Sequence, residues 1–185
     1  MDYYRGVTAV DVPRGGGSFV KERGFGHEAF NFQPHQGAYL GYVQATGQGI
    51  NLTRLGAQGV DSLADVTVIW VAKAPNARGT RVVGWNHRAT VYAEYQRVKS
   101  TSTRRLPDGN TPSYLVSADN GTLLTRDERS REVPRGTRTQ TGMGQSNIWY
   151  PDADDANALL AYVSGAEPGK RAKSGNVGAR LNDVR

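Results

Sequence analysis

The sequence predicts a single β-rich domain of the α+β class, built as a small, bent or partly closed β-barrel with a few short peripheral helices. Glycine is frequent, at 23 of 185 residues, and it separates short runs of β-branched and aromatic residues. That combination is typical of short strands joined by tight turns rather than of a helical bundle. The apolar runs indicate about five to seven strands, and helical periodicity is confined to one or two short stretches.

The first part of the chain contains few regular elements. Residues 1–36 are punctuated by glycines and are expected to form an arm or lid with room for one short strand. Residues 37–44 (GAYLGYVQ) predict a strand. Residues 50–55 (INLTRL) alternate apolar and polar side chains, which is typical of a half-buried strand.

The strongest strand signal covers residues 65–73 (DVTVIWVAK). Both of its faces are largely apolar, so we expect this strand at the centre of the sheet. A second long strand signal covers residues 80–98. Gly84 either breaks that segment into two strands or marks a β-bulge.

The C-terminal half predicts a hairpin and a helix. Residues 113–118 and 122–125 flank Asp119-Asn120-Gly121, a typical hairpin turn sequence. Asp152 or Asp154 can cap a helix over about residues 153–164. The domain is expected to span 1–165 and a basic tail or linker to span 166–185. The apolar residues of the helix that should face the core are Leu159, Leu160 and Val163.

Composition excludes several classes of protein. The chain has no cysteine, which excludes disulfides, zinc fingers and thiol catalysis. The N-terminus lacks the apolar run of a signal peptide, and no apolar stretch approaches the roughly 18 residues of a membrane span. We therefore expect a cytoplasmic protein with no membrane partner.

Charge favours nucleic acid as the partner. The net charge is +6, and only five of the 23 basic residues are lysines. Arginine carries a rigid fork of donors that matches phosphates and guanine edges. The alternative is a basic protein from an arginine-rich proteome.

Catalytic motifs are missing from the sequence. His27, His35 and His87 do not have the spacing of metal ligands, and no phosphate-binding loop or nucleophile elbow occurs. The acidic and lysine residues that nucleases use for hydrolysis are not arranged in a recognisable motif. We expect a binding module that needs no metal or cofactor, and not an enzyme by itself.

Arginines gather in two polar loops between residues 97 and 138, a stretch that contains nine basic and five acidic residues. Such loops on a barrel rim can straddle a duplex backbone, although chance charge on a solvated surface is the alternative. The candidate backbone contacts are Arg104, Arg105, Arg126, Arg129, Arg135 and Arg138.

Aromatic residues lie next to amides or small polar groups at several points. A pocket for a flipped base needs rings that stack on the base and an amide that reads its edge. Strand aromatics more often belong to the core, which is our expectation for Trp70, whereas Trp85 and Trp149 suit either role. The candidate pocket residues are Phe32, Tyr42, Trp85, Asn86, Asn147, Trp149 and Tyr150.

Several blocks of the chain resemble the N-terminal modules of bacterial modification-dependent (type IV) restriction proteins. The VVGW…ATVY strand pair after an IWVA-type strand is also similar to EVE domains of the PUA-like superfamily, which includes the SRA and YTH domains. The resembling blocks are GHEAFNF (26–32), GYVQ (41–44), INLTRLGA (50–57), VTVIWVAKAP (66–75), RVVGWNHRATVY (81–92), YLVSA (114–118), VPRG (133–136) and MGQSNIWY (143–150).

The resemblance implies a module that holds a modified base in an aromatic pocket on a bent β-barrel, beside a nuclease domain. It implies Trp85 and Asn86 as pocket residues, with Phe30, Phe32 and Trp149 as further candidates. An aromatic would be expected after this tryptophan, where the chain has Asn86.

The leading hypothesis is therefore a reader of 5-methylcytosine or 5-hydroxymethylcytosine in double-stranded DNA that flips the base and serves a restriction endonuclease in antiphage defence. The alternatives are an RNA-binding PUA-like module, a reader of phosphorothioate backbones and a protein-interaction scaffold of a defence system.

Overall fold

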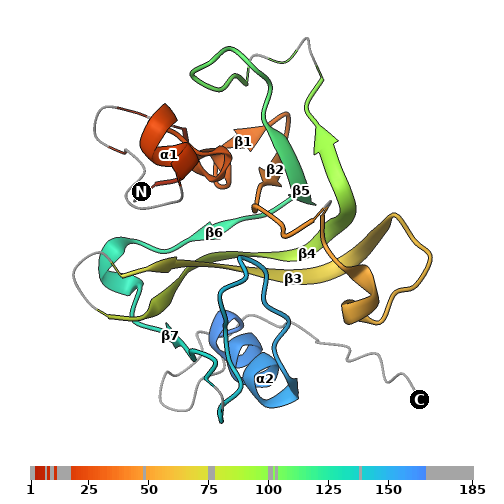
Figure 1. Cartoon of the computed structure of the whole chain (residues 1–185), viewed down its shortest axis with the longest axis vertical. Coiled ribbons are helices and arrows are strands. Elements are labelled where there is room, and N and C mark those ends of the chain that lie inside the picture. Colours follow the sequence, from red (N-terminus) through yellow and green to blue (C-terminus); the bar gives the residue numbers. More distant parts are fainter. Residues whose placement is uncertain are drawn as a thin grey trace.

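The computed structural model shows a β-rich chain with one open antiparallel sheet and two α-helices among the residues it describes (Figure 1). This agrees with the expected β-rich α+β class. The described residues are 3–6, 8, 11, 18–47, 49–74, 78–99, 102, 104–137 and 139–165. The expected tail at 166–185 lies outside them.

Seven strands make up the sheet, and short helices lie between them. The strands are β1 (Pro34–His35), β2 (Ala38–Gly41), β3 (Ser62–Lys73), β4 (Thr80–Arg97), β5 (Ser113–Ala118), β6 (Thr122–Leu123) and β7 (Glu132–Val133). The helices are α1 (Ser18–Arg23), α2 (Ala153–Val163) and three 3-10 turns, η1 (His27–Phe30), η2 (Leu52–Leu55) and η3 (Arg126–Glu128). None of the helices in the described part of the chain combines the length and apolarity that crossing a bilayer requires.

The central strand is β4, not β3. The sheet order is β1-β2-β5-β4-β3, and β6 and β7 also pair with β4. One edge of β4 is taken by β3, and the other is shared in turn by β7, β6 and β5. Figure 1 shows β4 changing direction along its length, from the β3 pairing to the β5 pairing.

The expectation that residues 65–73 form a central strand is wrong, because β3 pairs with β4 alone among the described strands. Its two faces are apolar for another reason. Val66, Val68 and Trp70 pack against the cluster around Val91, and Ile69 and Val71 pack against a cluster on the opposite face. Layers that cover both faces of a strand make it apolar wherever it lies in the sheet order.

Gly84 marks a β-bulge and does not interrupt β4. Trp70 pairs with Gly84 and Val71 pairs with Val82, so β4 has one extra residue at Val83. A Cβ at position 84 would collide with the Thr122 carbonyl and the Phe32 ring. Glycine is therefore required there by the close approach of β6 and the N-terminal layer.

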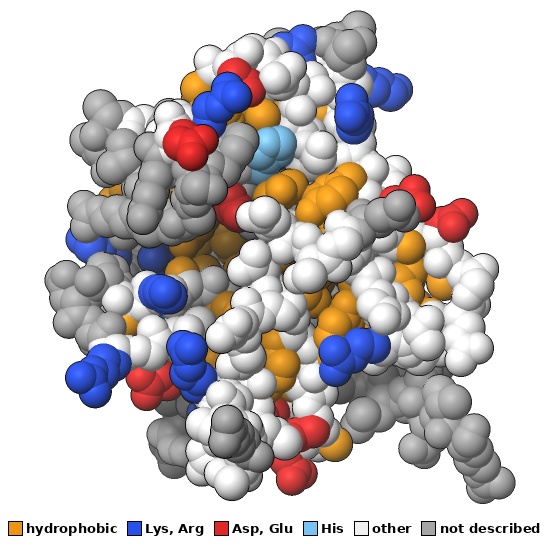
Figure 2. Space-filling view, in the orientation of Figure 1, with side chains coloured by type: hydrophobic (Ala, Val, Ile, Leu, Met, Phe, Trp, Pro, Cys, Tyr) orange, Lys and Arg blue, Asp and Glu red, His pale blue; other side chains and the backbone are white. Residues whose placement is uncertain are grey.

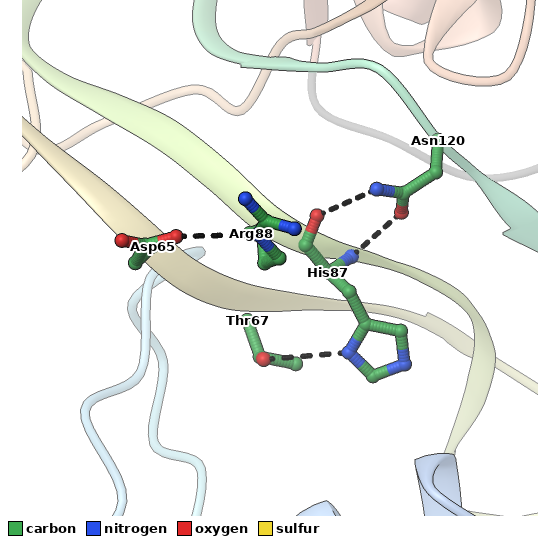
Figure 3. Close-up of polar contacts among 5 residues, drawn as sticks. All are labelled: Asp65, Thr67, His87, Arg88 and Asn120. Atoms are coloured by element: carbon green, nitrogen blue, oxygen red, sulfur yellow. Dashed lines mark hydrogen bonds and ion pairs between the residues drawn. The ribbon is translucent and has the colours of Figure 1, made fainter. Parts of the chain in front are cut away.

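Two further bulges bring Asp65 and Arg88 together (Figure 3). Both residues have positive φ, 61° and 50°, and their side chains form an ion pair of 3.5 Å. Because both side chains are more than three-quarters exposed, the pair contributes little to stability.

The expected hairpin of residues 113–125 does not form. β5 pairs with β2 and β4, and β6 pairs with β4 instead of β5. The turn residue Asn120 explains this, because its amide binds the backbone of His87 on β4 (Figure 3). Its Oδ1 accepts from His87 N–H at 2.9 Å and its Nδ2 donates to His87 C=O at 2.8 Å.

Two other expectations concern local elements. The strand expected at 50–55 is the 3-10 turn η2, which ends at Gly56 with φ 82°. The helix expected near 153–164 is confirmed as α2, and the Asp152 side chain accepts from the Asp155 N–H at 3.0 Å. Leu159 and Val163 are buried as expected, but Leu160 is 39% exposed.

Candidate functional site

An open hollow of about 1510 Å³ follows the free edge of β3. Ten consecutive residues, 65–74, line it. Neighbouring side chains of a strand point to opposite faces, so a cavity that touches all of them must run along the edge of the strand. The face drawn in Figure 2 has hydrophobic side chains in several hollowed places, with basic side chains among and around them.

The hollow brings together segments that are far apart in the sequence. One wall is the N-terminal layer around η1, and another is the segment that leads into α2. Figure 1 shows α1 and α2 on opposite sides of the β3–β4 pair. The aromatic residues that line the hollow are Tyr4, Phe32, Tyr42, Trp70, Trp149 and Tyr150.

Where the N-terminal layer lines the hollow, hydrogen bonds to the backbone hold a group of packed aromatic rings in place. The Asn31 side chain accepts from the Tyr42 N–H at 2.8 Å and donates to the Tyr42 C=O at 2.9 Å. The Tyr42 ring packs against His27, with 4.6 Å between ring centroids, and against Tyr95, at 5.5 Å. The Tyr95 hydroxyl in turn donates to the Val43 C=O at 3.0 Å. The position of the Tyr42 ring is therefore fixed by its backbone hydrogen bonds and by two neighbouring rings.

Burial shifts the pKa values of Glu28, His27 and Tyr42, in this part of the hollow, in the direction that favours the neutral form of each group. Burial raises the pKa of the Glu28 carboxyl and lowers the pKa of the His27 imidazole. Burial and then the neighbouring Tyr95 raise the pKa of the Tyr42 hydroxyl well above its ordinary value. These shifts indicate a poorly solvated corner, in which hydrogen bonds to a ligand are stronger than in water.

Trp70 and Asn86 form one unit at the centre of the site. The Trp70 Nε1–H donates to Asn86 Oδ1 at 2.6 Å, and Asn86 Nδ2 donates to the Asn120 C=O. Asn86 is 2% exposed and is not part of the lining of the hollow. It is therefore placed to fix the indole of Trp70 and not to contact a base directly.

Trp85 and Trp149 pack in the same apolar cluster, around Val82 and Leu159. The Trp85 ring meets the Tyr162 ring edge-on at 6.2 Å and does not line the hollow. Trp149 belongs to the cluster and also lines the hollow. The structure thus places Trp85 partly buried against an apolar cluster and away from the hollow, and Trp149 between the cluster and the hollow.

Tyr150 and Asn147 line the hollow where the segment before α2 meets the loop after β2. The Tyr150 hydroxyl accepts from the Asn51 N–H at 2.9 Å, and the guanidinium of Arg54 lies 4.4 Å from the centre of the Tyr150 ring. Asn147 Nδ2 donates to the Gln44 C=O at 3.1 Å. These contacts join the segment before α2 to the loop that follows β2.

Positive charge predominates in the lining. Two acidic residues, Glu28 and Asp65, line the hollow beside five basic ones. The basic residues are Arg54, Lys73, Arg81, Arg126 and Arg129. Arg129 also donates to the Leu124 C=O through Nε and Nη2, which fixes its guanidinium.

The remaining arginines that the sequence singled out lie elsewhere. Arg105 and Arg135 are exposed and do not line the hollow, and Arg138 lies outside the described residues. The expectation that Arg104 projects from a rim loop is wrong, because it is 7% exposed.

Arg104 instead supports the N-terminal layer. Its Nη2 donates to the Phe30 C=O at 2.7 Å and to the Leu40 C=O at 3.2 Å. Burial lowers the pKa of the guanidinium to about 10. The group links η1 to β2 from the inside, a role that a loop sequence rich in arginine does not reveal.

Among the residues of the hollow that sequence reasoning missed are Trp70, His27 and Glu28. Trp70 was expected in the core, and the His27-Glu28 pair was set aside because it is not a zinc motif. Both residues of the pair lie in the GHEAFNF block (26–32), which sequence reasoning singled out without using them. Comparisons of the chain with models of protein families, with curated proteins and with solved structures found no match.

Proposed function

We propose that the chain is a DNA-binding module that receives a modified cytosine, flipped out of the duplex, in the hollow along β3. One observation carries the proposal: six aromatic side chains and five basic side chains line the same hollow. Aromatic rings stack on bases, and arginine and lysine neutralise the phosphates that accompany them.

The size of the hollow favours a polymer over a small metabolite. Pockets for small molecules usually measure about 300–1,000 Å³. At about 1510 Å³, this hollow has room for a base and part of its backbone. Flipping a base costs a few kcal/mol, which stacking of roughly 1–3 kcal/mol per ring can offset.

The proposal includes a relationship to the bent barrels of the PUA-like superfamily and a role as the sensor of a restriction endonuclease. The change of direction of β4, which pairs with β3 along one part and with β5 along another, supports the first point (Figure 1). The resembling sequence blocks support the second. In this role the chain binds, and a nuclease domain cuts.

The test is a binding series with the full chain. Labelled duplexes carry one central cytosine, 5-methylcytosine, 5-hydroxymethylcytosine or phosphorothioate linkage, and an RNA of the same sequence is included, each at two salt concentrations. We expect one modified cytosine to bind most tightly at both salts. Equal binding of all duplexes, or no binding at low salt, would overturn the proposal, and preference for the RNA or the phosphorothioate would replace it.

Trp149→Ala tests whether the hollow holds the base. Loss of one stacking ring should weaken binding of the preferred duplex by about 1–3 kcal/mol, roughly 5- to 150-fold. Trp149→Phe keeps a ring and should retain most of the affinity. Tyr3→Ala is the matched control, because Tyr3 is 59% exposed and does not line the hollow. Thermal melts establish that each variant is folded.

A further inference from the structure

The carboxylate of Glu28 lines the hollow and has few internal partners. Glu28 lies in η1 and lines the hollow, and burial raises the pKa of its carboxyl. Apart from its own backbone N–H, no residue in the described part of the chain donates a hydrogen bond to it. Taking such an acceptor partly out of water without a partner costs free energy.

The local structure makes room for this carboxylate. The preceding Gly26 is buried, and a Cβ there would collide with Glu28 Oε2. Among the described residues, no basic side chain forms an ion pair with Glu28. The chain thus keeps beside an aromatic hollow an acceptor whose internal donor is its own backbone N–H.

The groups around Glu28 suit a planar ligand. The ring stack of His27 and Tyr42 lines the same hollow, as does Trp70. The indole N–H of Trp70 is already engaged by Asn86, so the indole offers a ring face and no donor. In this corner, Glu28 is the strong acceptor for the edge of a base.

We propose that Glu28 is a specificity residue, which accepts a hydrogen bond from the exocyclic amino group of the base in the hollow. The inference deepens the proposed function and rests on it. A carboxylate only accepts when ionised, and the N4 amino group of cytosine is the donor that Glu reads. Thymine and uracil carry a carbonyl oxygen at that position, which would face the carboxylate without a proton between them.

Thymine and 5-methylcytosine make a sharp pair of probes, because both carry the methyl group and they differ at the 4-position and at the protonation of N3. Each is placed opposite an abasic site in the same duplex, so that pairing does not bias flipping. An adenine probe separates recognition of any amino group from recognition of cytosine. The full chain should bind 5-methylcytosine at least about tenfold more tightly than thymine.

Glu28→Gln keeps the size of the side chain and supplies an amide that can donate to thymine. The variant should lose most of the preference for 5-methylcytosine while still binding the duplex. Glu22→Gln is the matched control, since Glu22 is exposed and outside the hollow, and it should keep the preference.

The outcomes separate this inference from the proposed function. If Glu28→Gln keeps the wild-type preference, Glu28 does not read the base, although the module still binds DNA. If adenine binds as well as 5-methylcytosine, the amino group is read but cytosine is not selected by Glu28. If the wild-type chain binds no duplex at low salt, the proposed function fails and this inference fails with it.

Discussion

The indole N–H of Trp70 on β3 donates a hydrogen bond of 2.6 Å to the side-chain oxygen of Asn86 on β4. Asn86 also donates to the Asn120 carbonyl in the turn before β6. One buried amide therefore ties a ring of the hollow to two other segments of the sheet. The ring position depends on Asn86 even though Asn86 does not line the hollow.

Asn86→Ala should destabilise the fold by about 2–4 kcal/mol, because it leaves the indole N–H and the Asn120 carbonyl without their partner and opens a small cavity. Urea unfolding followed by tryptophan fluorescence measures the loss. Asn147→Ala is the control, since Asn147 is exposed and makes one contact, to Gln44. A loss below about 0.5 kcal/mol for Asn86→Ala would show that this link is not structural.

Gly41→Ala should displace Trp70. A Cβ at this buried glycine would collide with the six-membered ring of the indole and approach Val116 at 3.3 Å. We expect a loss of about 1–3 kcal/mol and a shift of the tryptophan emission maximum. Gly144→Ala provides the comparison, because nothing lies within 4 Å of a Cβ there and its φ is not positive. Unchanged emission in Gly41→Ala would contradict the packing of Trp70 over β2.

Glu28→Gln should stabilise the fold at neutral pH but not in acid. Burial raises the pKa of this carboxyl in the folded chain, so folding favours the protonated form. Below the ordinary glutamate pKa of about 4.3, the carboxyl is neutral in both states and there is no penalty. The free-energy cost of burying the ionised carboxylate develops as the pH rises from there to the raised pKa of the folded chain. Above that pKa the cost stays constant.

The measurement is the melting temperature of both proteins at pH 4 and pH 7. The variant should gain up to a few degrees over wild type at pH 7, since about 1 kcal/mol corresponds to roughly 2–4 °C for a chain of this size. The exposed control Glu22→Gln should leave the melting temperature unchanged. An equal gain at both pH values would mean that the effect does not come from the charge of Glu28.

Arg126→Ala should weaken binding to DNA uniformly across sequences. It should also reduce the magnitude of the slope of the logarithm of the association constant against the logarithm of the salt concentration by about one. The expected cause is the loss of one phosphate contact at the basic side of the hollow. Arg97→Ala serves as the control, because Arg97 is exposed at the end of β4 and does not line the hollow. Titrations at four salt concentrations give the slopes, and equal slopes for the two variants would argue against a phosphate contact at Arg126.

Much of the site could be predicted because aromatic residues beside polar groups are visible in a linear pattern. Phe32, Tyr42, Trp149 and Tyr150 were candidates from the sequence, and all of them line the hollow. Trp70 was not a candidate, because an apolar strand offers no sign of which ring lies at a free edge. Glu28 was not a candidate either, because its place in the hollow depends on residues that are distant in the sequence.

The sequence by itself determined several local elements: the capped helix α2, the two long strands near 65–73 and 80–98, and an irregularity at Gly84, which it left open as a break or a bulge. These depend on capping groups, glycine and hydrophobic periodicity, which act over a few residues. Only the tertiary structure decided that β3 is an edge strand, that the turn at Asn120 attaches to β4, and that Arg104 is buried. The physical reason is that strand order and burial depend on contacts between residues far apart in the chain, and burial on both faces of a strand leaves the same pattern in the sequence at the edge of a sheet as at its centre.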